Sequence, residues 1–176
     1  MSKINKLKKL VAVAAGLILL SFIVSIIIKE IKNRRELEKI SILPQFSFTT
    51  LGNTPFTADS LKTGITTIVM IYSDECFHCL ENFDLVIDLV LDEPDIQVLM
   101  VSSDSLHRIQ RFKERFDVDD SMPISFTHCD MLELYNTFGR FNFPTLYLYD
   151  ENNKLIKKLS SDISTERLSK LLNLNY

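Results

Sequence analysis

The chain has 176 residues, with 20 Lys and Arg against 23 Asp and Glu and a formal net charge of −3. This length suffices for one folded domain and a short additional segment. The charge is unevenly distributed, because positions 40–176 carry 11 basic and 20 acidic side chains, a balance of −9. An acidic domain argues against nucleic-acid binding, which needs a basic surface. We therefore expect no nucleic acid among the partners.

The first predicted element is an apolar helix at residues 10–28, a run of 19 residues without a charge. At about 1.5 Å per residue it would span roughly 28 Å, close to the hydrocarbon thickness of a bilayer. A core helix of a globular protein would show a polar face, and this run has none. The run ends in Ser-Ile-Ile-Ile-Lys-Glu, without the small residues of a signal-peptide cleavage site. We therefore predict an uncleaved transmembrane anchor after a cytoplasmic tail at residues 1–9.

Basic residues flank the predicted anchor on both sides, four before it and five after it. The rule that positive flanks stay in the cytoplasm compares these numbers, and here they are too similar to decide the orientation. Residues 29–41 are charged and helix-permitting, which is typical of a juxtamembrane stalk whose basic residues lie near lipid headgroups. The folded domain is predicted at residues 42–176.

Strands and helices alternate through the predicted domain. Phe46 and Phe48 alternate with polar residues, as in a half-buried strand, and residues 51–56 are typical of a turn. Apolar periodicity then predicts strands at 65–72, 96–101, 123–127, 145–149 and 155–159, and helices at 76–92, 104–116, 130–138 and 164–172. This order predicts an α/β domain with a mixed, mostly parallel sheet that is flanked by helices and ends in an antiparallel hairpin.

Two cysteines, Cys76 and Cys79, lie where the buried strand at 65–72 leads into a helix. The free N–H groups and the dipole at a helix N-terminus favour thiolate over thiol. Because the cysteines are three residues apart, both sulfurs lie on one helix face and can close a disulfide. Cys76 is the predicted nucleophile toward a substrate disulfide, and Cys79 would resolve the mixed disulfide. His78 would favour the thiolate further if it were protonated or donated a hydrogen bond.

Two other interpretations share this cysteine spacing. A zinc site needs two more ligands, for which His128 and Cys129 are the remaining candidates. They end a strand expected two places from the strand before Cys76, and at roughly 4.8 Å per strand the gap of about 10 Å is too wide for one metal. Two inert buried thiols are the second interpretation, which the strand-to-helix position disfavours. We predict no metal, and a lone thiol at Cys129.

The segment CFHC after ITTIVMIY, together with FPT before LYLYD, resembles the thioredoxin-like superfamily. Within it, the chain is most similar to the membrane-anchored TlpA/ResA-like redoxins, which have AhpC/TSA-type relatives. The resemblance covers about residues 42–174 and includes the opening segment at Pro44. It implies a thioredoxin-like fold and a thiol–disulfide oxidoreductase that acts on protein thiols and disulfides. It also implies a membrane or soluble redox partner, and no cofactor beyond a redox-active Cys76–Cys79 disulfide.

The resemblance further implies a substrate groove beside the dithiol, formed by Phe143, Pro144 and Thr145. The proline at this position is cis in the family, so we expect a cis bond at Phe143–Pro144. Phe143 is bulkier than the residue that usually precedes this proline.

Three residues at the dithiol depart from the usual pattern and are expected to tune it. Glu75 replaces the usual Trp, and its charge opposes thiolate formation. Phe77 replaces the usual Pro between the cysteines. His78 is similar to the histidine in the CxHC of strongly oxidising thiol oxidases, where it stabilises the thiolate. Because Glu75 and His78 act in opposite directions, the direction of electron flow stays open.

Two alternative functions are weighed against the oxidoreductase. Ser73, three residues before Cys76, matches part of a peroxiredoxin site, but the proline of that motif would fall at Val69. A thiol-dependent peroxidase is one alternative, and a non-catalytic binding module is the other.

We expect the domain on the extracytoplasmic, periplasmic side of the cell membrane, because of the resemblance and because an anchored redox module suits an oxidising compartment. Arg108, Arg111 and Arg115 are predicted to form a solvated face.

Overall fold

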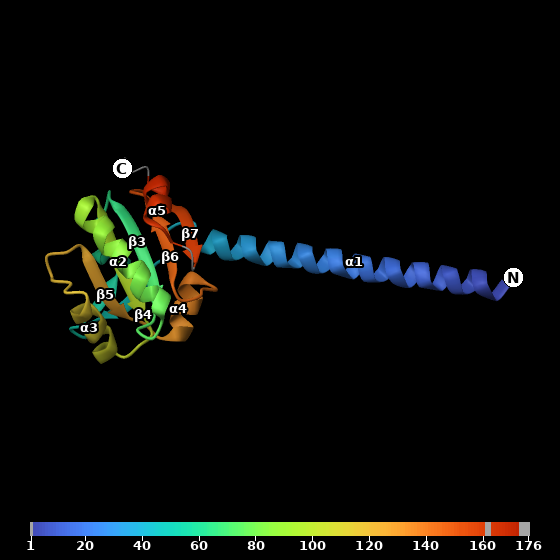
Figure 1. Ribbon diagram of the computed structural model, residues 1–176, viewed down its shortest axis with the longest axis horizontal. Coiled ribbons are helices and arrows are strands. Elements are labelled where there is room, and N and C mark those ends of the chain that lie inside the picture. Colours follow the sequence, from blue (N-terminus) through green and yellow to red (C-terminus); the bar gives the residue numbers. More distant parts are fainter. Residues whose placement is uncertain (1, 161–162, 173–176) are drawn as a thin grey trace. The chain divides into compact units, whose positions relative to one another are not determined.

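The computed structural model describes residues 2–160 and 163–172, without the side chains of 2–14, 33 and 165. The chain divides into two compact units, residues 1–38 and 39–176 (Figure 1). The first is a single helix, α1 (Ser2–Lys39), which contains the predicted anchor and most of the predicted stalk. The side chains of residues 10–14 of that anchor lie outside the described part. The last four residues of the predicted domain, 173–176, lie outside it entirely. Among the residues described, no helix is both long and apolar enough to cross a membrane.

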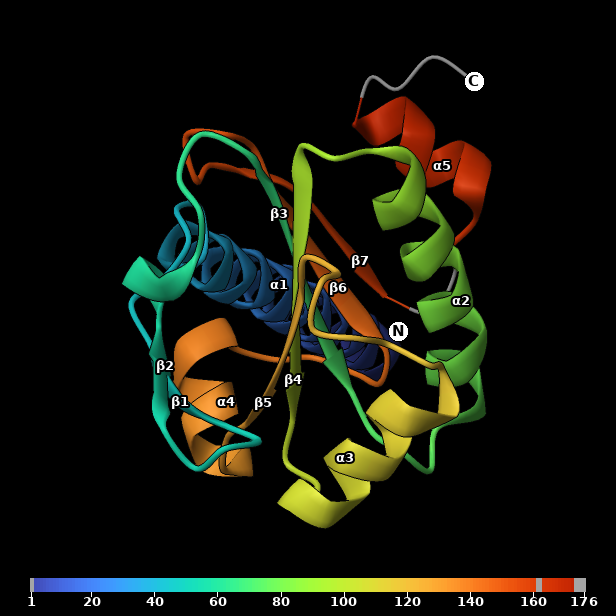
Figure 2. The same cartoon turned by 90° about the vertical axis from the view of Figure 1, so that its left-hand side faces the viewer.

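The second unit is built around a seven-stranded sheet with the order β2-β1-β5-β4-β3-β6-β7 (Figure 2). Its strands are β1 (Ser47–Thr50), β2 (Pro55–Thr57), β3 (Thr66–Tyr72), β4 (Ile96–Ser102), β5 (Ile124–His128), β6 (Thr145–Tyr149) and β7 (Leu155–Ser160). Within the described residues, only the β3–β4 and β4–β5 pairings are parallel, and the other pairings are antiparallel. The sheet is therefore mixed, and the prediction of a mostly parallel sheet is wrong.

Two features of the chain cause this difference. Pro55 and Phe56 were expected in a turn, but they belong to β2, which pairs back on β1. The helix after β5 has only eight residues, about 12 Å at 1.5 Å per residue. It does not return the chain to the opposite end of the sheet, so β6 starts at the same edge where β3 ends and runs against it.

The helices of the domain are α2 (Phe77–Asp92), α3 (Leu106–Arg115), α4 (Met131–Phe138) and α5 (Thr165–Leu171), with the 3-10 turn η1 at Ala58–Ser60. Each α-helix begins and ends within two residues of its predicted bounds. Figure 2 shows α2, α3 and α5 on one face of the sheet and α4 on the other. Alternate residues of β3 point to opposite faces of the sheet. Met70 packs with residues of α2 and α3, and Ile71 packs with residues of α4.

An aromatic cluster fixes α3 on the sheet close to the end of β3. The fully buried Phe112 ring lies 4.5 Å from the Tyr72 ring and 5.3 Å from the Phe83 ring, measured between centroids. Aromatic pairs at this separation stabilise more than their buried area alone. The cluster therefore holds the first turn of α3 next to the loop that follows β3.

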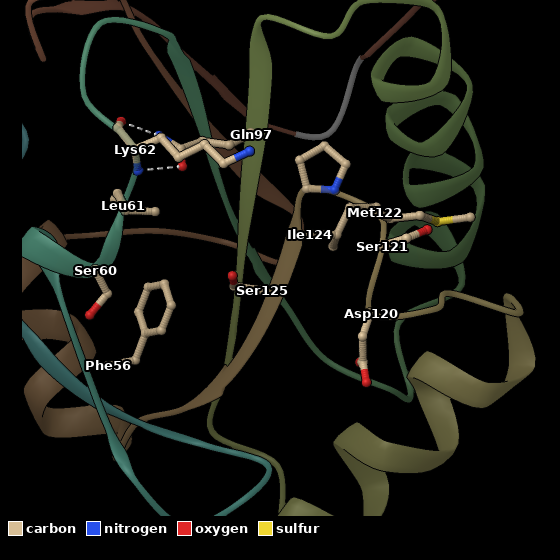
Figure 3. A pocket seen from close by; sticks show the side chains of 11 residues that line it. Phe56, Ser60, Leu61, Lys62, Gln97, Asp120, Ser121, Met122, Ile124 and Ser125 are labelled. Carbon is tan, nitrogen blue, oxygen red and sulfur yellow. Dashed lines mark hydrogen bonds between the residues drawn. The ribbon is translucent and has the colours of Figure 1, made fainter.

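A pocket of about 240 Å³ lies at the opposite edge of the sheet, near the starts of β4 and β5 (Figure 3). Gln97, on its wall, is buried and makes three hydrogen bonds. Its Oε1 accepts from the Lys62 N–H at 2.9 Å, and its Nε2 donates to the Lys62 carbonyl at 2.7 Å and to Thr67 Oγ1 at 2.9 Å. This amide thus fastens the loop before β3 to the sheet, far from the cysteines.

Replacing Gln97 with leucine is expected to lower the free energy of unfolding by about 2 kcal/mol, because both backbone groups of Lys62 lose their partner in a partly buried place. Urea denaturation measures this change. Gln110→Leu is the matched control, since the Gln110 amide donates to the exposed Glu114 side chain, and we expect a change below about 0.5 kcal/mol. Equal losses in the two variants would contradict the structural role of Gln97.

Candidate functional site

Cys76 lies between β3 and α2 as the N-cap residue of α2. Its Sγ accepts a hydrogen bond from the Cys79 N–H at 3.2 Å. An N-cap side chain satisfies one of the free N–H groups in the first helical turn, and an ionised acceptor does so more strongly than a neutral one. The side chain is half-buried and packs against the core cluster. The predicted position at a helix start is confirmed.

Cys79, in the first turn of α2, is fully buried. Burial raises the pKa of its thiol well above the ordinary range, and hydrogen bonding with Cys76 and the charge of Asp104 raise this pKa further. Cys79 therefore stays protonated and shielded while Cys76 is reached from outside. This asymmetry is what an attacking and a resolving thiol require.

Alkylation should reveal the same asymmetry in the reduced protein. We expect iodoacetamide at neutral pH to modify Cys76 and to leave Cys79 and Cys129 unmodified, because thiolate character and access control the reaction. Burial also raises the pKa of the Cys129 thiol, and the charge of Glu133 adds to this effect. Mass spectrometry of the digested protein, with and without denaturant, locates the label. Equal labelling of the three cysteines in the native protein would contradict the described site.

The three predicted tuning residues lie on the surface around Cys76. The Glu75 side chain is 80% exposed, and its Oε1 lies 3.0 Å from Nη2 of Arg108, which offsets its negative charge. The His78 side chain is 67% exposed, with its Nδ1 3.2 Å from Oε2 of Glu81. Phe77 is also exposed. Because Glu75 faces the opposite charge of Arg108, its effect on Cys76 is partly cancelled within that pair.

The predicted groove residues lie at the same edge of the sheet as the dithiol. Thr145 pairs with Ile71 in the antiparallel β3–β6 ladder, so Pro144 lies beside the end of β3 that leads to Cys76. The Phe143–Pro144 bond is cis, as expected. Thr145 is buried, and its Oγ1 donates to the Asn142 carbonyl at 2.8 Å, which fixes the loop before the proline. Phe143 is half-buried, with its ring 5.7 Å from that of Phe141.

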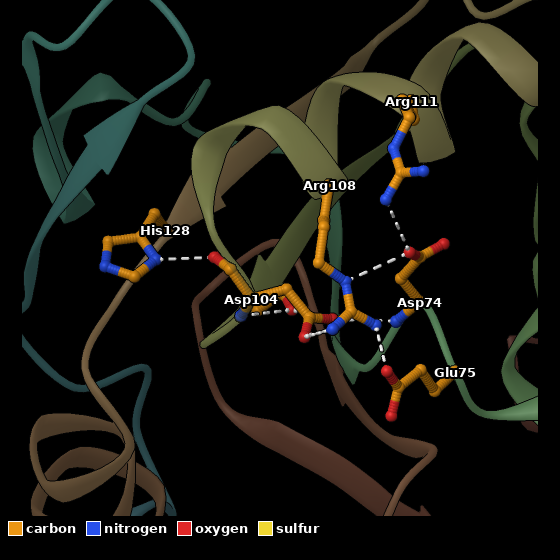
Figure 4. Close-up of polar contacts among 7 residues, drawn as sticks. Asp74, Glu75, Asp104, Arg108, Arg111 and His128 are labelled. Atoms are coloured by element: carbon orange, nitrogen blue, oxygen red, sulfur yellow. Dashed lines mark hydrogen bonds and ion pairs between the residues drawn. The ribbon is translucent and has the colours of Figure 1, made fainter.

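Sequence reasoning missed a charged cluster next to the dithiol (Figure 4). Arg108, expected on a solvated face, is only 29% exposed and lies between Asp74, 21% exposed, and Asp104, 14% exposed. Asp74 precedes the cysteines, whereas Asp104 follows β4. The sequence could have indicated that Asp74 and Asp104 lie close together, because adjacent parallel strands place the residues after their carboxyl ends at one edge of the sheet.

Asp104 connects this cluster to the buried groups behind the cysteines. Its Oδ2 accepts from the Asp74 N–H at 2.7 Å and from Ser102 Oγ at 3.1 Å. The pKa of the Tyr72 hydroxyl is raised by burial and then by the charges of Asp104 and Asp74. β3 itself contains no acidic residue. The carboxylate of Asp104, which follows the neighbouring strand β4, is one of the charges that act on the buried Tyr72 and Cys79.

The zinc candidates His128 and Cys129 occupy other environments. His128 ends β5, two strands from β3 as expected, and its Nδ1 donates to the Asp104 carbonyl at 2.9 Å. Cys129 is buried in the core under α4, on the other face of the sheet from Cys79. In the part of the chain that the structure describes, no three His, Cys, Asp or Glu side chains are grouped to hold a metal ion.

Comparison with known proteins gives structural neighbours only. No protein-family model and no curated protein matches the chain. A secreted Mycobacterium tuberculosis disulfide oxidoreductase homologous to E. coli DsbE is 14% identical, with a TM-score of 0.63 over 77% of this chain and 97% of that one. M. tuberculosis DsbF is 17% identical, with a TM-score of 0.63 over 77% and 95%. A thioredoxin-like protein from Aeropyrum pernix is 15% identical, with a TM-score of 0.63 over 82% and 93%. The chain therefore has the thioredoxin-like fold.

Proposed function

We propose that the protein is a thiol–disulfide oxidoreductase that acts on protein thiols and disulfides through Cys76 and Cys79. The observation that carries this proposal is the asymmetry of the pair: Cys76 is half-buried at a helix N-cap, whereas Cys79 is fully buried one turn later. The cis proline supports the proposal by its place, because it lies beside the end of β3 that leads to Cys76. The fold shared with disulfide oxidoreductases is further support.

The exchange reaction needs only the two sulfurs. The Cys76 thiolate attacks one sulfur of a client disulfide, so that the client S–S bond breaks, a mixed disulfide forms and the client's other sulfur leaves as a thiolate. Cys79 then gives up its proton and attacks Cys76 Sγ, which closes the Cys76–Cys79 disulfide and releases the second client thiol. Two electrons have passed to the client, and the reverse sequence oxidises it. No further cofactor enters this scheme, and a membrane or soluble redox partner would return the pair to its starting state.

Activity assays on the full chain test this proposal. We expect catalysis of insulin-disulfide reduction with a dithiol reductant, or of the oxidation of a reduced peptide with two cysteines, depending on the reduction potential of the pair. Appreciable consumption of hydroperoxide with neither exchange activity would favour the peroxidase alternative. A protein inactive in all three assays would favour a non-catalytic binding module and contradict the proposal.

We also propose that residues 10–28 anchor the protein in the cell membrane with the domain outside the cytoplasm. The charge-free run in the sequence supports this, as does the exposure of apolar side chains along α1, among them Leu17, Ile18 and Phe22. The description of one structural neighbour as secreted supports the side of the membrane. In cells, we expect the chain in the membrane fraction after carbonate washing, and Cys76 labelled by a membrane-impermeant maleimide. A chain released by carbonate, or a Cys76 labelled only after lysis, would contradict the anchoring or the orientation.

A further inference from the structure

One arginine joins three carboxylates from the two loops beside the dithiol (Figure 4). The Nε of Arg108 lies 3.2 Å from Oδ2 of Asp74, and its Nη2 lies 3.0 Å from Oε1 of Glu75. Its Nη1 lies 3.7 Å from Oδ1 of Asp104. Asp74 and Glu75 immediately precede Cys76. We call Arg108 and these three carboxylates the Arg108 cluster.

We propose that Arg108 is a positioning residue that sets the electron affinity of the dithiol. It would do so by holding the loop before Cys76 against the loop after β4, and by neutralising the carboxylates that border the two thiols. This inference rests on the proposed function, which makes the Cys76–Cys79 pair redox-active.

The geometry gives the cluster more effect than a surface ion pair. Exposed pairs are screened by water and contribute little, whereas partly shielded charges interact more strongly. Arg108 is 29% exposed, and two of its partners, Asp74 and Asp104, are 21% and 14% exposed. The backbone of Arg108 is fixed as well, because α3 packs on the core through Phe112 and the buried Ile109. The planar guanidinium is suited to bridging several carboxylates at once.

The charges that face the cysteines give the sign of the effect. The three carboxylates lie on the loops that border the pair. Burial and the hydrogen bond with Cys76 raise the pKa of Cys79, and the charge of Asp104 adds to this effect. A second cation, Arg111, also contacts this group of carboxylates, with its Nη2 3.8 Å from Oδ2 of Asp74. On the far side, His128 donates from Nδ1 to the Asp104 carbonyl group, and its Nε2 lies 3.9 Å from Oδ1 of Asp130. Without Arg108 the carboxylates would disfavour a thiolate, which exists only in the reduced form.

Removing Arg108 should therefore stabilise the disulfide relative to the dithiol. For Arg108→Gln in the full chain, we expect the equilibrium constant for reduction by glutathione to fall about tenfold. A tenfold change corresponds to about 30 mV for this two-electron couple. We also expect alkylation of Cys76 in the reduced protein at neutral pH to slow severalfold. Arg115→Gln is the matched control, because Arg115 is exposed and two turns further along the same helix, about 10 Å away. It should change neither value more than twofold.

A second variant separates electrostatic tuning from structural support. Glu75→Gln removes one carboxylate from an exposed side chain, so it should shift the equilibrium in the opposite direction, toward the dithiol, and should not disturb folding. Equal effects of Arg108→Gln and Arg115→Gln, or shifts of the same sign for Arg108→Gln and Glu75→Gln, would overturn the inference. If Arg108→Gln does not fold, Glu75→Gln alone decides it. A wild-type chain that forms no Cys76–Cys79 disulfide would refute the proposed function, and the alkylation rates would still test the role of Arg108.

Discussion

Replacing Cys76 with serine is expected to abolish thiol–disulfide exchange and leave only the uncatalysed background rate. Serine keeps the size and the N-cap role of the residue, but its hydroxyl is not ionised at neutral pH and cannot attack a disulfide. The measurement is the rate of insulin-disulfide reduction or of peptide oxidation, whichever the wild-type protein catalyses. Because the substituted atom remains a hydrogen-bond acceptor for the Cys79 N–H, the loss would report on chemistry and not on folding.

Two further cysteine variants complete this test. Cys79→Ser should retain the first attack and accumulate a mixed disulfide between Cys76 and the client, detectable on a non-reducing gel, because the resolving thiol is absent. Cys129→Ser should keep its activity, since Cys129 lies in the core on the other face of the sheet. Full activity of Cys76→Ser, or a client mixed disulfide on Cys79 that accumulates in Cys76→Ser, would contradict the assigned roles.

Phe112→Ala is expected to lower the free energy of unfolding by about 3–5 kcal/mol, the usual cost of removing a fully buried aromatic side chain. Phe112 is in ring contact with Tyr72, Phe83, Phe116 and Phe126, so the cavity would open at the centre of the layer between the sheet and α3. The midpoint of urea unfolding measures the loss. The same variant should weaken the Arg108 cluster, because α3 carries Arg108 one turn before Phe112.

Phe77→Ala is the control for this stability measurement. The Phe77 side chain is largely exposed between the cysteines, and we expect its removal to change the free energy of unfolding by less than about 0.5 kcal/mol. A loss of several kcal/mol in Phe77→Ala, or none in Phe112→Ala, would mean that the aromatic cluster is not what holds α3 on the sheet.

Local patterns predicted the elements and the dithiol but not the direction of every strand. The β-branched run of β3 and the apolar spacing of α2 are properties of short segments, so they placed Cys76 at a helix start. The cis bond at Phe143–Pro144 was implied by the family resemblance of the FPT motif, whereas the local pattern by itself indicates only a proline at the start of a strand. The direction of β6 depends on how far α4 carries the chain, and the pairing of β2 depends on a turn that brings Pro55 back to Thr49. The local sequence pattern predicts neither the reach of α4 nor the turn between β1 and β2.

The Arg108 cluster shows the same limit for the site. The helical spacing of Arg108, Arg111 and Arg115 is typical of a solvated face, and for Arg115 exposure agrees with it. Arg108 differs because the ends of β3 and β4 bring Asp74 and Asp104 to its side chain from positions 30 residues apart. The charge of Glu75, which in the sequence has no neighbouring Lys or Arg, is paired with Arg108 for the same reason. Long-range contacts of this kind follow from strand order, which the sequence pattern left partly undetermined.

The redox titration of the full chain against glutathione tests the central claim most directly, that Cys76 and Cys79 form a working redox pair. Mass spectrometry after acid quenching and alkylation would measure the fraction of molecules with this disulfide at each ratio of reduced to oxidised glutathione. We predict a reversible two-electron transition that involves these two cysteines alone, with a potential between about −270 and −120 mV, the range from a reductant such as thioredoxin to an oxidant such as DsbA. A chain whose Cys76 and Cys79 never pair at any ratio would contradict the account.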